Sequence, residues 1–311
     1  MSDMQRNPTL PKTSMGRHLY PSVHAFAAHD AWVLAADLVR SDDFATALYE
    51  YCRGLTAPPA MAWPINKIFG QKLRYITCYI LIGNYTRWRR FGKELPTLAA
   101  LKAAVDASPR QVAELVSSLR AGGIIIAERH EADRRSVLLK PSRLLLQEVA
   151  KAPLLSLAAY ERLRKPKRQL EHVVSATDDA LCDWIGRSTE EYRAADILFG
   201  PFPDIVEFTD RDCGYLVLTA AMGVHYASEL SRDDWTLPLR YDSLAAQFQV
   251  SRQHIANVFA YAEDRGLLSV KRGKLDVISP LLISQFETWA AGQMAHYALL
   301  AEKMASEADD D

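Results

Sequence analysis

The chain has 311 residues, a length typical of about two domains. Hydrophobic residues make up 49% of it and charged residues 24%, which is typical of a globular protein and excludes a disordered or fibrous one. The formal net charge of −1 does not mark the whole chain as a nucleic-acid binder. Any surface that binds DNA must therefore concentrate cations locally and balance them with acids elsewhere.

The sequence also disfavours metal-binding, secreted and membrane proteins. The cysteines, Cys52, Cys78, Cys182 and Cys213, are far apart and have no histidine at metal-ligand spacing, so we expect neither a zinc site nor a disulfide framework. The N-terminus lacks the apolar core of a signal peptide, and no apolar run reaches the roughly 18 residues of a membrane span. The prediction is a cytoplasmic protein with no metal, no cofactor and no membrane partner.

The first part of the chain predicts an arm, helices and a loop. Residues 1–20 contain prolines and cations but no periodic apolar face, which predicts a flexible arm. Two helices are expected between residues 23 and 55, with Ser41 as the cap of the second. The prolines of residues 57–64 exclude a regular helix and predict an extended loop. Residues 73–88 are apolar on nearly every side and therefore predict a buried helix.

Residues 98–139 predict two helices joined by a turn and followed by a hairpin. Ser108 is placed to cap the second helix, and Pro109 suits its first position. Arg110 and Gln111 open that helix, and side chains of these types bind guanine and adenine edges in the major groove. The candidate DNA contacts on the hairpin are Arg129, His130, Arg134 and Arg135.

This charged hairpin, followed by Lys140-Pro141-Ser142, resembles the wing of the MarR family of transcription regulators. The resemblance implies that Asp133 and Arg135 form a pair that stabilises the turn. It also implies that an arginine of the wing enters the minor groove.

Residues 144–163 predict a further helix, and Pro166 breaks it at the expected domain boundary. Basic residues gather around this boundary, in residues 162–168, and earlier in residues 87–93. Each cluster fits phosphate contact as well as it fits an ordinary solvated helix end, so both interpretations stay open.

Residues 237–280 predict a second helix, turn, helix and hairpin. Ser251 is the expected cap of the second helix, and Gly266 ends it where a left-handed residue is needed. The helix opens with Ser-Arg-Gln-His and closes with Arg-Gly-Leu-Leu, and in these features resembles the recognition helix of the Crp and GntR groups. Its candidate DNA contacts, with those of the basic turn, are Ser251, Arg252, Gln253, His254, Lys271, Arg272 and Lys274.

The two stretches look like an internal duplication. When Ser108 is aligned with Ser251, identical residues also coincide in both helices of the motif. With three residues fewer in the loop of the first copy, identical residues coincide in the long helix before the motif as well. The pairs are Leu101 with Leu244, Ala103 with Ala246, Ala113 with Ala256, Gly123 with Gly266, Tyr75 with Tyr215 and Gly83 with Gly223.

The remaining segments of the second half are also expected to be helical or disordered. Residues 179–192 predict a pair of short helices with a joint at Arg187 and Ser188. Residues 281–304 have an apolar face at helical spacing, which predicts a helix that packs on the first half or on another subunit. The acidic residues 306–311 predict a disordered tail.

These patterns predict a mainly α protein with two duplicated winged helix-turn-helix domains, small β-hairpin wings and extra packing helices. The expected domains are residues 21–164 and 165–305, between the arm of residues 1–20 and the tail of residues 306–311. The resemblances imply a bacterial transcription regulator, not an enzyme, that reads two half-sites of double-stranded DNA. Phosphates would be held by wing cations, and base edges by residues at the start of each second helix.

Other functions remain open. A plasmid-type replication initiator uses tandem winged helices, and a winged helix also serves as a protein–protein adaptor. The sequence contains no phosphate-binding glycine loop, no metalloprotease motif and no nucleophile elbow, so no catalytic site is predicted. A homodimer and a small-molecule effector are left open. Candidates for an effector cleft between the domains are Tyr75, Tyr79, Tyr85, Trp88, Tyr215 and Tyr226.

Overall fold

A computed structural model describes residues 17–59 and 65–310. Helices predominate, and two antiparallel two-stranded sheets occur in the described residues, which confirms the predicted mainly α class. Most of the predicted arm and part of the predicted loop, residues 1–16 and 60–64, lie outside the described residues. Within the part that the structure describes, every helix is too short or too polar to cross a membrane.

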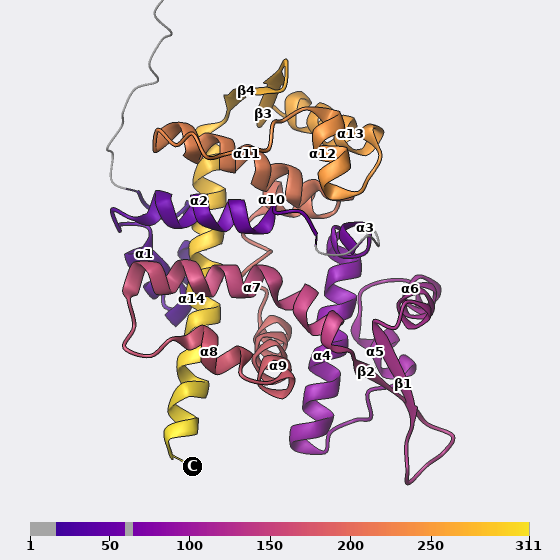
Figure 1. The fold of residues 1–311 in the computed structure, drawn as a ribbon. Helices are drawn as coiled ribbons and strands as arrows, with labels where there is room; N and C mark the ends of the chain where they lie inside the picture. Colours follow the sequence, from indigo (N-terminus) through magenta and orange to yellow (C-terminus); the bar gives the residue numbers. More distant parts are fainter. Residues whose placement is uncertain (1–16, 60–64, 311) are drawn as a thin grey trace, which may run out of the picture.

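The first half leads through short helices to a long helix, a helical pair, a hairpin and a second long helix (Figure 1). Its elements are the 3₁₀ helix Pro21–Phe26, α1 (Asp30–Leu38), α2 (Phe44–Leu55), α3 (Ile65–Phe69), α4 (Lys72–Phe91), α5 (Leu98–Ala104), α6 (Pro109–Ala121), β1 (Ile125–Arg129), β2 (Val137–Pro141) and α7 (Arg143–Arg164).

The second half repeats this order. Its elements are α8 (Leu170–Ser175), α9 (Asp178–Ala194), α10 (Pro203–Thr209), α11 (Gly214–Glu229), α12 (Tyr241–Phe248), α13 (Arg252–Asp264), β3 (Leu268–Lys271), β4 (Lys274–Ile278) and α14 (Pro280–Asp310). We call α4 to β2, residues 72–141, the first unit, and α11 to β4, residues 214–278, the second unit.

The two units are built alike. In each, the apolar side chains of the second short helix are buried at helical spacing, as with Val112 and Val116 on α6. The segment that precedes the first short helix lies beside the hairpin in both units. In the first unit, the carbonyl of Pro96 accepts a hydrogen bond of 2.7 Å from the N–H of Leu139. In the second unit, the N–H of Leu239 donates to the carbonyl of Gly273 over 3.1 Å.

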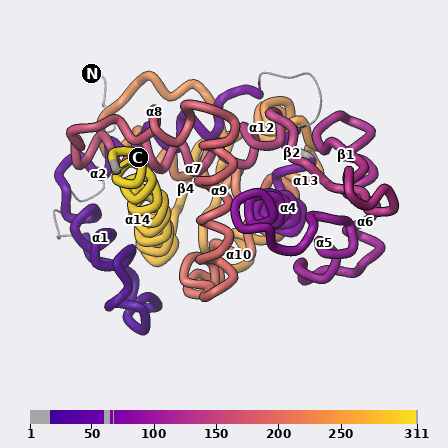
Figure 2. Tube along the Cα trace, turned by 90° about the horizontal axis from the view of Figure 1, so that it is seen from below, coloured from indigo at the N-terminus to yellow at the C-terminus, as the bar shows by residue number. Residues whose placement is uncertain are grey.

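The two halves exchange helices. Helix α2 of the first half packs along α11 of the second unit, and α9 of the second half packs along α4 of the first unit. Helices α7 and α14 pack on each other, and α1 packs on α14. Figure 2 shows α9 beside α4 and α1 beside α14. Each unit is therefore completed by a helix from the other half. Of the two alternatives expected for the C-terminal helix, the structure shows packing on the first half.

The crossing of α4 and α9 depends on small residues. Both helices carry the sequence Gly-x-x-Thr, as Gly83 with Thr86 on α4 and Gly186 with Thr189 on α9. A Cβ atom on Gly83 would collide with the Thr189 side chain, and one on Gly186 would lie 2.5 Å from the Thr86 side chain. The helix backbones approach closely because neither glycine has a side chain.

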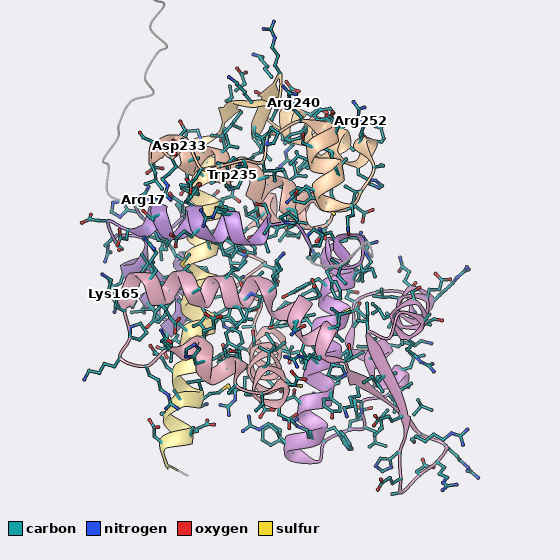
Figure 3. The ribbon with its side chains drawn as sticks, viewed as in Figure 1. Arg17, Lys165, Asp233, Trp235, Arg240 and Arg252 are labelled. Atoms are coloured by element: carbon teal, nitrogen blue, oxygen red, sulfur yellow. The ribbon has the colours of Figure 1, made fainter. Side chains whose placement is uncertain are left out.

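The segment that follows α11 contacts both α2 and α11. The ring of Trp235, which is labelled in Figure 3, covers Gly223 and leaves no room for a Cβ atom there. The carboxylate of Asp234 accepts hydrogen bonds of 2.8 Å from the Tyr49 hydroxyl and 2.8 Å from Arg53, both on α2. This segment therefore attaches the first half to the second unit.

We expect the Asp234 contacts to stabilise the fold in a pH-dependent way. The hydrogen bond from Arg232, followed by that from Tyr49, holds the pKa of Asp234 below its ordinary value. Because the folded pKa is the lower one, the stabilisation is complete above the unfolded pKa of about 3.9. It is lost as the pH falls through the folded pKa. Asp234→Asn should therefore lower the melting temperature at neutral pH, and its difference from wild type should shrink in acid.

Thermal melts at pH 7 and in stepwise acid down to about pH 3 would measure this difference. The matched control is Asp233→Asn, because Asp233 is the exposed neighbour of Asp234 (Figure 3) and has no ion-pair partner among the described residues. A loss for Asp234→Asn that stays constant across the pH series would contradict the expectation.

One predicted break and one predicted cap are wrong. Helix α9 continues through Arg187 and Ser188, where a joint was expected. The Ser188 hydroxyl is satisfied by contacts at 2.5 Å with Tyr79 and 2.6 Å with His296, so it does not compete with the helix backbone. The cap of α2 is also misplaced, because its N-cap residue is Asp43 and not Ser41.

The predicted disorder of the acidic tail is wrong as well. Helix α14 continues to Asp310, and its last turns are held by ion pairs. Glu307 pairs with Arg187 at 2.5 Å, and Asp309 pairs with Arg168 at 2.8 Å. The acids at this end neutralise cations of the second half, so the segment is ordered by contacts distant in the sequence.

Candidate nucleic-acid interface

The start of α6 is fixed by a reciprocal cap. The Ser108 hydroxyl accepts from the N–H of Gln111 over 3.2 Å, and the Gln111 side chain accepts from the N–H of Ser108 over 3.2 Å. Pro109 occupies the first helical position, as predicted. The Arg110 side chain is 88% exposed and pairs with Glu114 at 2.7 Å. Arg110 is therefore presented to solvent, whereas the side-chain oxygen of Gln111 is used in the cap.

The exposed face of α6 extends beyond the predicted residues. Glu114, Ser117 and Ser118 are exposed and lie four, seven and eight positions after Arg110 in the sequence. Residues at these spacings share one face of a helix. The sequence analysis named only residues in the first turn of this helix. The other three could have been identified by their helical spacing from Arg110.

The start of α13 is also capped by a serine, but without the return bond to the backbone and in a different environment. The Ser251 hydroxyl accepts from the N–H of His254 over 3.2 Å, as predicted for the N-cap. The His254 ring is held at both nitrogens, since Nδ1 lies 2.7 Å from the Ser251 hydroxyl and Nε2 lies 3.2 Å from Asp212. Arg252 and Gln253 are exposed. All three candidate base contacts are therefore exposed, but both ring nitrogens of His254 have partners within the protein.

The exposed face of α13 includes a residue that was not predicted. Gln253 donates a hydrogen bond of 2.8 Å to the side-chain carbonyl of Asn257, one turn further along. Ala260 and Asp264 are exposed on the same side. Asn257 carries a side-chain amide, as Gln253 does. It could have been identified from the sequence, because it lies four residues after Gln253 and therefore on the same face of the helix.

The first hairpin is shaped by Asp133. Its carboxylate accepts from the backbone N–H of Arg135 over 3.1 Å and from the Ser136 hydroxyl over 2.8 Å. The Ser136 bond, followed by the Arg135 backbone bond, lowers the pKa of Asp133. Asp133 therefore stabilises the turn through the backbone of Arg135, while the Arg135 side chain stays exposed.

The other candidate contacts of this hairpin differ in exposure. The His130 ring lies edge-on to the ring of Trp88 on α4, with 6.3 Å between the ring centres, so His130 supports the hairpin from the inside. The side chains of Arg129 and Arg134 are exposed. Among the residues that the structure describes, neither these two nor Arg135 has an ion-pair partner.

The second hairpin turns through Arg272 and Gly273, whose φ angles are 52° and 76°. Two consecutive residues with positive φ form the tight turn that suits the twist of an antiparallel hairpin. Lys271 pairs with Asp276 at 2.7 Å. Arg272 and Lys274 are exposed, and the described part of the chain contains no ion-pair partner for either. This hairpin therefore presents two free cations at its tip.

Helices α6 and α13 lie toward one side of the protein. In Figure 1, α13 lies above α6 on the right, and in Figure 2 both are again on the right, away from α1 and α14. Figure 3 places Arg252 at the upper right and Lys165, in the basic connection between α7 and α8, at the left. The exposed starts of α6 and α13 thus share a side that the basic connection does not share.

The other basic clusters are used within the fold. In the connection, Arg162 pairs with Glu50 at 3.1 Å, and Arg168 pairs with the end of α14. At the end of α4, Arg89 pairs with Asp183 of α9 at 3.0 Å. The Arg89 pair joins the two halves, and the other two pairs lie within one half each. All three favour the structural interpretation of both clusters over phosphate contact.

A buried polar cluster joins α4, α9 and α14. The Ser188 hydroxyl lies 2.6 Å from Nε2 of His296, and Nδ1 of His296 lies 3.0 Å from Glu191. Ser188 is 0% exposed and His296 is 2% exposed, so the cluster belongs to the interior packing. No group of three or more His, Cys, Asp or Glu side chains in residues 17–59 and 65–310 is arranged to hold a metal ion.

Comparisons with known proteins were made for the whole chain. No family model matches it, and no curated protein or solved structure matches it either.

Proposed function

We propose that the protein binds double-stranded DNA in a sequence-specific manner and acts as a bacterial transcription regulator. The two units are winged helix-turn-helix modules related by duplication, with α6 and α13 as recognition helices and the two hairpins as wings. One observation supports this most directly: two serine-capped helix starts with exposed polar side chains, each beside a hairpin with free cations, lie on the same side of the protein.

The exposed residues have the chemistry that base recognition needs. Arg110 and Arg252 can each form paired hydrogen bonds with guanine, and Gln253 and Asn257 can do so with adenine. The N-terminal end of a recognition helix is the part that enters the major groove. In this proposal these four side chains read bases, and the free hairpin cations hold phosphates or the minor groove.

The ion pair on α6 does not prevent Arg110 from reading a base. An exposed pair four residues apart on a helix, such as Arg110 with Glu114, is worth about 0.2–0.5 kcal/mol. A paired contact with the correct base contributes about 1–3 kcal/mol of discrimination. The DNA contact is the stronger one, so Arg110 can exchange Glu114 for guanine.

The proposal is tested by selection from a pool of random duplexes. The full chain at physiological salt should retain sequences that contain two unlike half-sites, with centres about 10 bp or a small multiple apart. The log of the affinity should fall with the log of the salt concentration by about 0.9 per phosphate contact. If no sequence is enriched, or if the affinity does not depend on salt, DNA reading is excluded and an adaptor role is favoured. Direct repeats among the retained sequences would favour a replication initiator.

A matched pair of variants then locates the phosphate contacts. Arg134→Ala with Arg135→Ala removes two cations from the first hairpin, and Lys165→Ala with Lys167→Ala removes two from the connection on the other side. We expect the hairpin variant to weaken all sequences together and to lower the salt slope by about one unit for each cation that holds a phosphate in the wild type. The connection variant should behave as wild type. Equal slopes for the two variants would place the DNA elsewhere.

A further inference from the structure

A cavity of about 150 Å³ lies where the two halves meet. Its walls include α4 and α11, the first helices of the two units, together with α7 and α14. Tyr75 and Tyr215, which align in the internal repeat, both line it. The cavity is therefore in contact with both units at equivalent positions.

Aromatic side chains dominate the lining. The rings of Tyr75 and Tyr79 are stacked, with 6.1 Å between their centres and 18° between their planes. The ring of Tyr215 meets that of Trp289 edge-on, with centres 4.8 Å apart. The other aromatic residues of the lining are Tyr51, Phe69, Tyr192, Phe199 and Tyr297. Such walls suit a flat apolar molecule, because aromatic rings prefer stacked or edge-to-face neighbours.

Three tyrosine hydroxyls of the lining, those of Tyr51, Tyr75 and Tyr215, bond within the protein. Pro153 lies inside α7 and has no N–H, so the carbonyl of Val149 loses its partner within the helix. The Tyr75 hydroxyl donates to this carbonyl over 3.0 Å. The hydroxyls of Tyr51 and Tyr215 bond each other at 2.8 Å. These contacts hold the walls in place.

Trp289 differs from the tyrosines. It is 5% exposed, and its indole N–H has no hydrogen-bond partner in the described part of the chain. Buried donors in proteins are nearly always paired, so an unpaired one in a cavity wall is available to an acceptor that a ligand supplies. Trp289 itself lines the cavity, between the rings of Tyr215 and Phe199.

The charged groups of the lining favour a neutral ligand. Glu148 and Lys151 lie one turn apart on α7 and are half-buried. Burial raises the pKa of Glu148 and lowers the pKa of Lys151, and the opposite charges of the two groups compensate each other. Lys72 is neutralised by Asp210 at 3.0 Å. The cavity thus offers no uncompensated charge to an ionic ligand.

We propose that this cavity binds a small, uncharged aromatic molecule whose hydrogen-bond acceptor receives the indole N–H of Trp289. A cavity of about 150 Å³ is large enough for one benzene ring, which sets the size of the ligand. The ring lies against Tyr75 on one unit and Tyr215 on the other. Because the ligand contacts both units, its binding favours one relative placement of α4 and α11.

The test uses two probes of nearly the same shape, acetophenone and ethylbenzene, of which only the first carries an acceptor. Binding to the full chain is measured by calorimetry and by ligand-observed NMR. We expect acetophenone to bind more tightly by roughly two- to tenfold, because one added hydrogen bond increases the affinity by about this factor. Trp289→Phe keeps a ring but removes the donor, so it should abolish this preference while ethylbenzene still binds.

A second variant places the probes in the cavity. Ala152 lines the cavity on α7, and Ala152→Trp should fill it and prevent both probes from binding. Ala176→Trp, at an exposed position between α8 and α9, is the matched control and should bind both probes as wild type does. The proposal is overturned if neither probe binds, or if Trp289→Phe keeps the preference for acetophenone. Binding to a folded Ala152→Trp variant would overturn it as well. None of these results depends on whether the protein binds DNA.

Discussion

Replacing Arg252 or Gln253 with alanine should weaken binding of the selected DNA by about 1–3 kcal/mol for each residue. Both side chains are exposed at the start of α13, and neither supplies the cap, so the fold should not change. The loss should be confined to one or two base pairs of one half-site. Affinities for the selected site and for its single-base variants, at one salt concentration, measure this.

The first unit supplies the matched control. Arg110→Ala removes the corresponding exposed side chain on α6 and should relax the preference only at the other half-site. Lys274→Ala in the second hairpin should instead weaken all sequences alike, because Lys274 is one of the free cations and a phosphate contact carries no sequence information. If Arg252→Ala and Gln253→Ala bind the selected site as wild type does, α13 is not a recognition helix.

Gly83→Val should destabilise the fold by about 1–3 kcal/mol or more, which is the usual cost of overpacking a buried contact. A side chain at Gly83 collides with Thr189 of α9, so α4 and α9 must move apart. Gly83→Ala should show a smaller loss in the same direction. Thermal or denaturant unfolding of the three proteins measures the series.

Another helix glycine provides the control. A Cβ on Gly54 of α2 would meet only the end of the Leu155 side chain, at 2.5 Å. That side chain can rotate away, and alanine favours a helix over glycine by about 1 kcal/mol, so Gly54→Ala should be close to neutral. Thr189→Ala combined with Gly83→Ala should recover part of the loss. Losses that simply add in the double variant would show that this contact is not the cause.

Local features of the fold were predictable from the sequence. Ser108 and Ser251 cap their helices, and Gly123 and Gly266 have the positive φ angles expected at helix ends. Each of these features depends on a few neighbouring residues, so a short stretch of sequence contains the necessary information. The exchange of α2 and α9 between the halves was not predicted, because an apolar stripe shows that a face is buried but not against which helix.

In the candidate site too, local features were predictable from the sequence and long-range contacts were not. The exposed residues at the helix starts follow from the cap positions, and Asn257 follows from helical spacing. The surroundings of His130 and His254 do not, because their partners Trp88 and Asp212 are distant in the sequence. The mistaken joint at Arg187 has the same origin, since its partner Glu307 lies at the other end of the second half.

The exchange of helices determines which spacing of half-sites the proposed regulator accepts. Two DNA-binding domains on a flexible linker tolerate half-sites at several distances. Here α2 and α9 hold each unit against the opposite half, so packed helices and not the connection of residues 165–169 fix the distance from α6 to α13. Inserting about 5 bp, half a helical turn, would rotate one half-site to the far side of the duplex. A chain built in this way holds α6 and α13 at a fixed distance. It would therefore reject such a site, even though each half-site is intact.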